Sequence, residues 1–243
     1  MNALPVSQIK ENYFRTLERI AQAAKAVGRK PEDVGLVVVT KTHPVEIIEA
    51  VIKEGAQYLG ENYAEQALPK IQALSAQYKV EWHMIGHVQS RKADLVCEYF
   101  DYLHSLDSLK LAARLDCLAE ERDRILPVLL ELNLGGEESK YGWPIWQEEH
   151  WPAILPDLER VIEMPHLKVK GLMGMAPFFD EAETARPFYR RLRLFQNYVQ
   201  SRLPQEDWHE LSMGMSADFE IAIQEGATWV RIGQSIFGPR KSG

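Results

Sequence analysis

Eight short strand-like runs, separated by segments with helical patterning, constrain the fold of this chain more than any other feature. The runs are rich in β-branched and apolar residues, which favour strands. They lie at 35–40, 57–60, 80–86, 101–106, 126–133, 167–175, 208–214 and 228–233. Strands that alternate with helices predict parallel βαβ units. Eight such units can close on themselves and leave no free edge, so we predict a single (β/α)8 TIM barrel in preference to an open, doubly wound sheet.

Residues that commonly start, cap or end helices support the helices predicted between these runs. Pro44 suits a first helical turn, and Gly55 can end the same helix in the left-handed conformation. Ser108 is placed to cap a later helix, whereas Pro69 predicts a kink or a break in its segment. An additional N-terminal helix, before Gly35, would lie outside the eightfold repeat.

Length and composition narrow the class of protein. A chain of 243 residues commonly forms one α/β barrel, so we expect a single domain over residues 1–243. The net charge of -7 argues against general attraction to nucleic acid or to anionic membranes. Because the N-terminal stretch is polar and no apolar run approaches about 18 residues, we expect a cytoplasmic protein. Cys97 and Cys117 have no metal or redox motif around them, and we interpret both as reduced packing residues.

The lysine that ends the first strand is the first candidate for chemistry. Lys41 follows the apolar run "GLVVVT", and the functional face of such barrels is the carboxyl end of the strands. Its amine would therefore project into the barrel mouth. A solvated lysine at a strand end is the ordinary alternative for an arbitrary lysine.

A candidate phosphate site lies at the ends of the last two strands. Ser212 and Gly214 precede a helix that begins near Ser216, and a hydroxyl with exposed backbone N–H groups can hold phosphate there. Gly233 allows close backbone approach at the end of the last strand. Two ordinary strand-to-helix turns are the alternative, but together these turns indicate one anion site.

Other polar side chains could complete the mouth. Arg231 lies two residues before Gly233 in the last strand, so both positions face the same side of the sheet. A buried arginine must pair with an acid, a carbonyl or a ligand. Asn62 could offer a directional hydrogen bond or simply form a turn. His83 is a further contact candidate; a metal site shared with His87 is disfavoured because no third ligand accompanies the pair.

These residues together describe a site for a phosphorylated aldehyde. An amine, a phosphate cradle and an arginine suit pyridoxal 5'-phosphate (PLP), with Lys41 forming a Schiff base and Arg231 facing the ring nitrogen. Because arginine would leave that nitrogen largely unprotonated, the cofactor would be a poor electron sink and transamination is disfavoured.

Several motifs resemble those of the pyridoxal phosphate homeostasis proteins. They cover nearly the whole chain from Val34 to Gly238, in the family's order. The motifs are "VVVTKTHP", "GENYAEQALPK", "WHMIGHVQSRK", "SLD", "GLMGM", "LSMGMSADFEIAI" and "RIGQSIFG".

The resemblance implies a fold-type III PLP-binding barrel similar to the N-terminal domain of alanine racemase. It implies a covalent bond from the cofactor to Lys41, and contacts from the residues already named together with a lining methionine. The full set of cofactor-binding candidates is Lys41, Asn62, His83, Met173, Ser212, Gly214, Arg231, Gly233 and Gln234. Gln234 departs from the serine or threonine common in the family, which leaves backbone or amide groups to contact phosphate. The variant "HVQSRK" is expected to be harmless.

The resemblance also implies a role in buffering or delivering PLP and in vitamin B6 and amino-acid or keto-acid homeostasis, without established catalysis. PLP is the expected ligand, PLP-requiring enzymes are candidate recipients, and neither nucleic acid nor membrane is expected as a partner. Racemisation needs a second acid or base, and the chain ends about ten residues after its last strand, so we expect no second domain to supply one. We expect a monomer.

Two enzymatic alternatives stay open. One is a small PLP-dependent racemase or decarboxylase-like enzyme that uses a loop tyrosine such as Tyr141, in the loop 134–144. The other is a sugar-phosphate barrel enzyme that forms a lysine imine without a bound cofactor.

Overall fold

The computed structural model describes residues 4–137 and 140–239, and its strands match the eight predicted runs. One short additional strand, β6, follows β5. The strands are β1 (Gly35–Val39), β2 (Tyr58–Glu61), β3 (Glu81–Met84), β4 (Tyr102–Leu106), β5 (Leu126–Asn133), β6 (Trp143–Pro144), β7 (Leu167–Gly174), β8 (Glu210–Ser212) and β9 (Trp229–Ile232).

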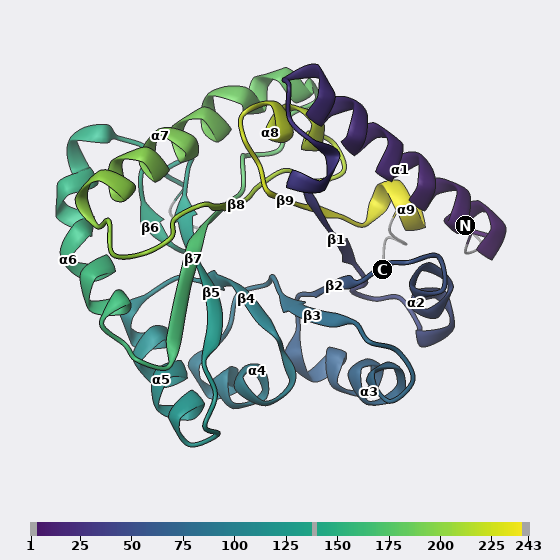
Figure 1. Ribbon diagram of the computed structural model, residues 1–243, viewed down its shortest axis with the longest axis horizontal. Coiled ribbons are helices and arrows are strands. Elements are labelled where there is room, and N and C mark those ends of the chain that lie inside the picture. Colours follow the sequence, from purple (N-terminus) through teal and green to yellow (C-terminus); the bar gives the residue numbers. More distant parts are fainter. Residues whose placement is uncertain (1–3, 138–139, 240–243) are drawn as a thin grey trace.

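The sheet closes into a barrel. Strands follow the order β4-β3-β2-β1-β9-β8-β7-β5, and β4 also pairs with β5. Each of these pairings is parallel. The predicted TIM barrel is therefore confirmed, and an open doubly wound sheet is excluded because both would-be edges are paired. The short β6 pairs only with the last residues of β5, Leu132 and Asn133 (Figure 1).

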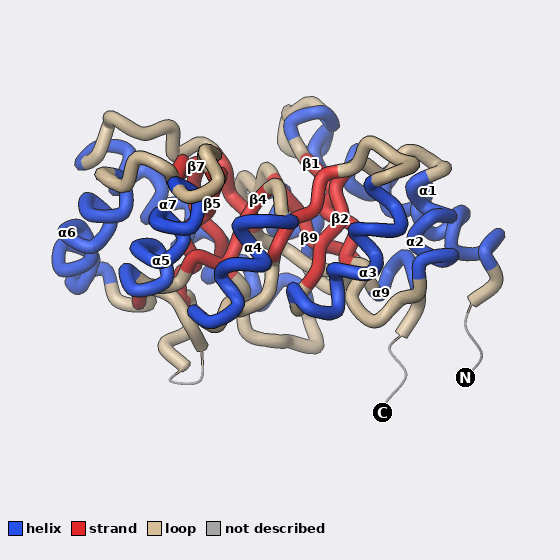
Figure 2. The backbone as a smooth tube through the Cα atoms, turned by 90° about the horizontal axis from the view of Figure 1, so that it is seen from below, coloured by secondary structure: helices blue, strands red, loops and turns tan. Residues whose placement is uncertain are grey.

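Helices cover the outside of the strands (Figure 2). The α-helices are α1 (Val6–Ala26), α2 (Val45–Ile52), α3 (Ala64–Ser75), α4 (Ala93–Tyr99), α5 (Leu109–Glu120), α6 (Trp151–Ile162), α7 (Arg186–Arg202), α8 (Phe219–Gln224) and α9 (Gln234–Phe237). Short 3-10 turns are η1 (Pro31–Asp33), η2 (Ser90–Lys92), η3 (Glu148–His150) and η4 (Ala182–Ala185). The helix at the end of the last repeat, α9, has only four residues.

The N-terminal helix compensates for the short α9. α1 packs against α2, α8 and α9 (Figure 1). The Asn12 side-chain amide on α1 donates to the carbonyl of Ile236 on α9 at 3.0 Å. The helix that we expected to lie outside the repeat thus occupies the outer ring, where α9 is too short to cover the sheet alone.

Side chains of the strands point alternately to two environments. We call the layer between strands and helices the shell; its strand residues form one large apolar cluster with the helices and include Val38, Leu59, Trp82, Met84, Leu103, Val128, Leu130, Leu132, Leu172, Leu211, Val230 and Ile232. We call the barrel interior the lumen. Its residues include Val37, Tyr58, Gly60, His83, Tyr102, His104, Leu129, Glu131, Met173, Glu210, Ser212, Trp229 and Arg231. The Tyr102 hydroxyl on β4 reaches the Glu210 carboxylate on β8 at 2.8 Å, a contact that crosses the barrel interior.

Local details test the punctuation residues. Gly55 has φ +102 after α2, and the Ser108 hydroxyl accepts from the backbone N–H of Leu111, so both predicted roles are confirmed. Pro69 lies inside α3, which continues through it to Ser75; the predicted break was wrong. Cys117 is exposed, so only Cys97 is a packing residue.

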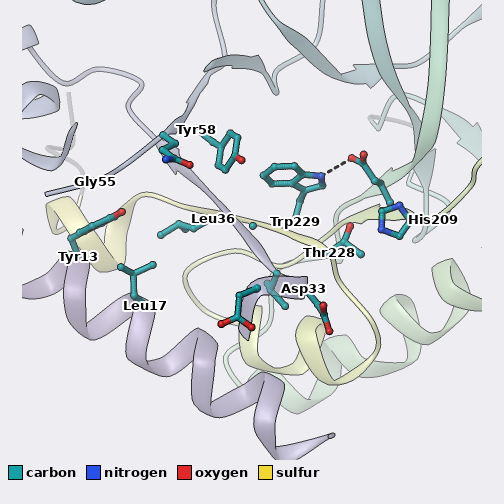
Figure 3. A pocket seen from close by; sticks show the side chains of 14 residues that line it. Tyr13, Leu17, Asp33, Leu36, Gly55, Tyr58, His209, Thr228 and Trp229 are labelled. Atoms are coloured by element: carbon teal, nitrogen blue, oxygen red, sulfur yellow. Dashed lines mark hydrogen bonds between the residues drawn. The ribbon is translucent and has the colours of Figure 1, made fainter. Parts of the chain in front are cut away.

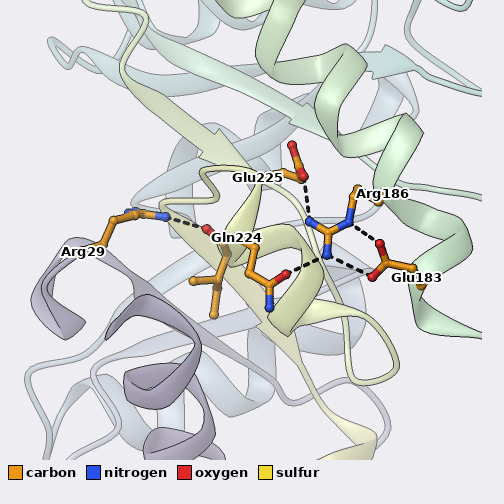
Figure 4. A network of polar contacts seen from close by, with 6 residues as sticks. Arg29, Glu183, Arg186, Gln224 and Glu225 are labelled. Carbon is orange, nitrogen blue, oxygen red and sulfur yellow. Dashed lines mark hydrogen bonds and ion pairs between the residues drawn. The ribbon is translucent and has the colours of Figure 1, made fainter. Parts of the chain in front are cut away.

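A polar network fastens the outer helices near the end of the chain (Figure 4). The Arg186 guanidinium, at the start of α7, donates to Glu183 in η4 and to Gln224 and Glu225 at the end of α8. Glu225 lies 2.7 Å from the guanidinium. The network joins two neighbouring repeats outside the shell.

Candidate functional site

Lys41 lies at the carboxyl end of β1, where the strand turns toward α2. The preceding backbone N–H, of Thr40, still donates to the Gly60 carbonyl of β2 at 2.9 Å. Thr42 then adopts φ +67, a left-handed conformation that is uncommon for residues other than glycine. The strand therefore ends abruptly at the half-buried Lys41, at the barrel mouth.

A buried ion pair holds this strand end in place. The Lys70 ammonium on α3 lies 2.7 Å from the Glu61 carboxylate and donates to the Thr40 carbonyl at 3.0 Å. The Thr40 hydroxyl donates to the same carboxylate oxygen at 2.6 Å. Because Thr40 immediately precedes Lys41, this cluster fixes the backbone that carries the candidate amine. The sequence reasoning missed it, although both charged residues lie in the quoted motif "GENYAEQALPK".

The first and last strands are direct neighbours. Val38 pairs with Ile232, and a Cβ built on Gly233 would lie 3.1 Å from the Val39 carbonyl oxygen. A side chain at 233 would crowd β1, so glycine allows the close approach that brings Lys41 beside the turn after β9. Gln234 follows that turn and is exposed.

The turns after β8 and β9 are bonded to each other. The backbone N–H of Ser235 donates to the Ser216 hydroxyl oxygen at 3.2 Å, and Gly214 accepts from the Arg231 N–H at 3.0 Å. Gly214 has φ +91, and a Cβ there would lie 2.5 Å from Ala222, so glycine is required at that position. Ser216 and Ser235 are half-buried and were not among the predicted contacts. Their hydroxyls next to two glycines were the signal available in the sequence.

Arg231 and Ser212 are buried together in the lumen. Arg231 is 4% exposed; its Nη1 donates to the Ser212 hydroxyl at 2.6 Å and its Nη2 to the Gly174 carbonyl at 3.2 Å. Burial lowers the pKa of Arg231, although Tyr189, Glu131 and Asp218 act in the opposite direction. Arginine keeps its charge at neutral pH in spite of such a shift. The predicted requirement for a partner is thus met by a hydroxyl and a carbonyl.

Two buried acceptors near the strand ends have no hydrogen-bond partner among the described residues. They are Asn62 Oδ1, just after β2, and Glu131 Oε2 on β5. Burial, reinforced by the nearby Asp107, raises the pKa of Glu131 to about 7, while Arg231 lowers it. Unsatisfied buried acceptors are costly, and a ligand with hydroxyl or N–H donors would satisfy them.

Two predicted contacts lie deeper in the lumen. The His83 ring is fully buried and contacts the rings of Tyr58, Tyr102 and Trp229. Met173 is also fully buried and packs with Tyr102 in a small apolar cluster. Their contact with a cofactor stays a prediction.

His83 and His87, for which a shared metal site was disfavoured, have separate partners. His83 pairs with His104, whereas His87 Nδ1 lies 2.7 Å from the Asp107 carboxylate. Within residues 4–137 and 140–239, no group of three or more His, Cys, Asp or Glu side chains could hold a metal ion.

Loop residues border the mouth. The Tyr141 ring stacks on His87 with centroids 3.6 Å apart, and it is half-exposed. Asn133 anchors the loop after β5 by accepting from the N–H groups of Gly135 and Gly136. A cavity of about 150 Å³ opens between the loops after β7 and β8, beside Met175 and Met215.

A larger cavity, about 520 Å³, lies at the opposite end of the barrel (Figure 3). Residues at the amino ends of the strands, among them Gly35, Tyr58 and Trp229, line it together with Tyr13 of α1. The Trp229 indole N–H donates to Glu210 at 2.6 Å there. None of the predicted site residues lines this cavity.

The family model for the alanine racemase N-terminal domain matches residues 15–241. The pyridoxal phosphate homeostasis protein of Pseudomonas aeruginosa is 40% identical over 242 residues, covering 98% of both chains. This chain belongs to the pyridoxal phosphate homeostasis protein family. Within the family, the structure of PipY from Synechococcus elongatus with PLP bound has a TM-score of 0.77 and 34% identity, and the match covers 90% of this chain and all of that one.

More distant structures share only the barrel. Alanine racemase of Clostridium difficile has a TM-score of 0.69 at 15% identity, over 94% of this chain and 60% of the enzyme. That likeness supports the fold of this family member and carries no functional argument. The curated relatives from Pseudomonas aeruginosa and Escherichia coli are named homeostasis proteins rather than enzymes. No described helix is long and apolar enough to cross a lipid bilayer.

Proposed function

We propose that residues 1–243 form one domain that binds PLP covalently at Lys41 and buffers or delivers it within the cell. The observation that supports the proposal is the pairing of β1 with β9, because Lys41 and the Gly233 turn then follow neighbouring strands at the mouth, with Arg231 buried in the lumen just beneath them. One small molecule can therefore reach an amine, an anion site and a guanidinium. The PipY structure with PLP bound, from a relative at 34% identity, supports this choice of ligand.

PLP supplies an aldehyde that condenses with a primary amine and releases one water molecule. Lys41 is the amine in our proposal, and its position is fixed by the Thr40, Glu61 and Lys70 cluster. Preorganisation of this kind reduces the entropy lost on binding.

The phosphate would lie over the bonded turns after β8 and β9. We assign its contacts to the backbone at Gly214 and Gly233, to the Ser216 hydroxyl and to the neighbourhood of Gln234. Ser216 is better placed than Ser212, because Ser216 is half-buried and bonded to the Ser235 amide. Ser212 is fully buried and its oxygen already accepts from Arg231.

Arg231 would face the ring nitrogen with guanidinium donors that are not used by Ser212 and Gly174. An arginine cannot donate a full proton there, so the ring nitrogen stays unprotonated. Asn62, with its orphaned oxygen, would accept from a ring substituent. The arrangement favours retention of the cofactor over chemistry that needs a strong electron sink.

A buffering role places the chain in the cytoplasm, where PLP-requiring enzymes would receive the cofactor. The names of the relatives support this role in vitamin B6 homeostasis. We propose a monomer, which light scattering would test directly.

Borohydride reduction followed by peptide mass spectrometry tests the covalent bond. We expect a pyridoxyl adduct on Lys41 in protein incubated with PLP, and a yellow colour before reduction. Lys41→Ala should lose both, while the exposed control Lys110→Ala keeps them. A reduced adduct spread over surface lysines would overturn the assignment.

A small racemase is the second candidate, since Tyr141 stacks on a histidine that is itself bonded to Asp107. In this alternative, the Tyr141 hydroxyl would hold a proton at the mouth. Incubation of the PLP-loaded protein with L- and D-amino acids in heavy water separates the two functions. Sustained exchange of the α-proton that is lost in Tyr141→Phe would favour the enzyme.

A further inference from the structure

Four side chains form a continuous hydrogen-bonded chain through the lumen. The Arg231 Nη1 donates to the Ser212 hydroxyl at 2.6 Å, and the same oxygen lies 2.8 Å from His104 Nδ1. His104 Nε2 lies 2.8 Å from His83 Nδ1. His83 Nε2 then lies 3.9 Å from the Glu81 carboxylate at the amino end of β3. We call Ser212, His104 and His83 the column.

The column is enclosed by protein. All three of its side chains are fully buried. The aromatic rings of Tyr58, Tyr102 and Trp229 surround His83, with centroid distances between 5.1 and 5.5 Å. In such surroundings hydrogen bonds in a chain strengthen one another, and His83 Nε2 is the one atom of the column that has no hydrogen-bond partner among the described residues.

Arg231 sets the direction of the first bond. A guanidinium has donors only, so the Ser212 oxygen must accept from it. The hydroxyl proton of Ser212 then has one acceptor among the described residues, His104 Nδ1. His104 must therefore be neutral with its proton on Nε2, and it donates to His83 Nδ1. His83 in turn carries its proton on Nε2.

The far end agrees with this direction. With its proton on Nε2, His83 makes no hydrogen bond among the described residues, but the negative Glu81 carboxylate, which is 58% exposed, lies 3.9 Å away and attracts that proton. The reverse direction would place a bare ring nitrogen next to that carboxylate and leave the Ser212 proton unpaired. Donor and acceptor at the two ends therefore require the same order of protons.

Burial and nearby positive charge also keep His104 neutral. Burial, followed by His83 and Arg231, lowers the pKa of His104 well below its usual value. Two charged groups lie at the ends of the column, Arg231 next to Ser212 and Glu81 next to His83. The other titratable groups near the column are the side chains of Tyr58, Tyr102 and Glu210. Burial and Glu210 raise the pKa of Tyr102, so the phenol stays protonated.

We infer that the column positions Arg231 for the cofactor: its aligned dipoles solvate the buried guanidinium and hold it in one orientation toward the ring nitrogen. Arg231 has no carboxylate within hydrogen-bond distance among the described residues. An isolated buried charge is costly, and the column offsets that cost by presenting acceptor ends toward Arg231 and donor ends toward Glu81. Ser212, His104 and His83 are positioning residues on this account. The inference rests on the proposed function for its ligand and on the apo protein for its geometry.

The first test needs no cofactor. Nitrogen-15 NMR of labelled histidines in the apo protein at neutral pH should show His83 and His104 as Nε2–H tautomers. His83→Gln and His104→Gln assign the two signals, and exposed His150 serves as the reference histidine. In Ser212→Ala the His104 signal should shift, and Ser212→Thr, which keeps the hydroxyl, should restore it. An imidazolium or an Nδ1–H tautomer at His104 would overturn the column.

The second test separates positioning from phosphate binding. Ser212→Ala should weaken binding of PLP and of unphosphorylated pyridoxal alike, by about tenfold, because one hydrogen bond to a charged group is lost. Ser212→Thr should recover most of the affinity, and exposed Ser201→Ala should have none of these effects. A loss confined to PLP would make Ser212 a phosphate ligand and overturn the inference. If the wild-type chain binds neither compound, the proposed function fails, whereas the NMR result still judges the column.

Discussion

The shell and the lumen share the same strands but differ in side-chain chemistry: the shell is apolar, whereas the lumen contains many polar groups. Outward-facing residues such as Val38 and Leu59 join one continuous apolar cluster with the helices. Inward-facing residues include only a small separate apolar cluster, of Tyr102, Leu129 and Met173. The lumen also carries buried polar groups, including Arg231 and Glu210, both of which make hydrogen bonds.

This difference assigns stability mainly to one layer and ligand chemistry to the other. Apolar burial in the shell is insensitive to pH and to exact geometry, since it depends on area removed from water. The contribution of a buried polar group to stability depends on its partners and its protonation state. The effect of a substitution in the lumen on the free energy of unfolding therefore depends on pH. The substitutions below probe that contrast.

Lys70→Ala removes one partner of a buried ion pair at the mouth end of the shell. Its ammonium is 11% exposed and Glu61 is 1% exposed. We expect a loss of about 4 kcal/mol in the free energy of unfolding, because the carboxylate is left uncompensated. Urea unfolding measures it, with the exposed Lys53→Ala, paired with Glu49, as a control that should leave the midpoint unchanged. A loss no greater than in the control would mean that the pair does not hold the strand end.

Leu59→Ala opens a cavity in the apolar part of the shell. Leu59 is fully buried on β2, and we expect a loss of about 3 to 4 kcal/mol at any pH where the protein folds. Leu59→Met, which conserves volume, should cost less than about 1.5 kcal/mol. Urea titrations at pH 5 and pH 8 test both claims; a strong pH dependence would contradict the contrast with the lumen.

Glu131→Gln should stabilise the apo protein at neutral and alkaline pH. The folded-state pKa of about 7 exceeds the ordinary value of 4.5, so the unfolded chain loses its proton first as pH rises. The wild type therefore loses about 2 to 3 kcal/mol from this group between pH 4.5 and pH 7, and glutamine avoids the loss. Below pH 4.5 the two proteins should be equally pH-dependent. Parallel stability curves from pH 4.5 to pH 8 would rule out the raised pKa.

Arg186→Ala tests the polar network outside both layers. The guanidinium is 30% exposed, so solvent screens its bonds to Glu183 and Glu225. We expect a loss of about 1 kcal/mol, reduced by added salt, without any change in PLP affinity. Thermal unfolding at low and high salt measures it. A loss as large as that of Leu59→Ala would show that the network contributes as much to the free energy of unfolding as a buried apolar side chain of the shell.

The sequence was most informative about the shell. Outward-facing apolar residues on every second strand position produced the eight recognisable runs, and the helix punctuation at Gly55 and Ser108 followed local rules. It was less informative where a tertiary contact overrode a local rule. Pro69 is tolerated inside α3, and the short α9 is compensated by a helix some 200 residues away in the chain.

Strand ends at the mouth are easier to recognise in the sequence than the lumen beneath them. Lys41 and Gly233 stand at strand ends, where the fold class itself says that function lies. Ser216, Glu131 and His104 were not among the predicted contacts, because a polar residue within or just after a strand looks solvent-facing until the sheet is closed. Family motifs do not say which hydroxyl faces which group.

By itself, the order of residues determined the barrel, its family and the strand ends at which binding groups gather. Those properties follow from local periodicity and motif spacing, which the chain carries in one dimension. Only the closed structure decided that Arg231 meets Ser212, that two histidines link it toward Glu81, and that Lys70 secures the turn before Lys41. Such contacts join distant strands and a helix across a buried interior, and their strength arises from burial that exists only once the barrel has closed.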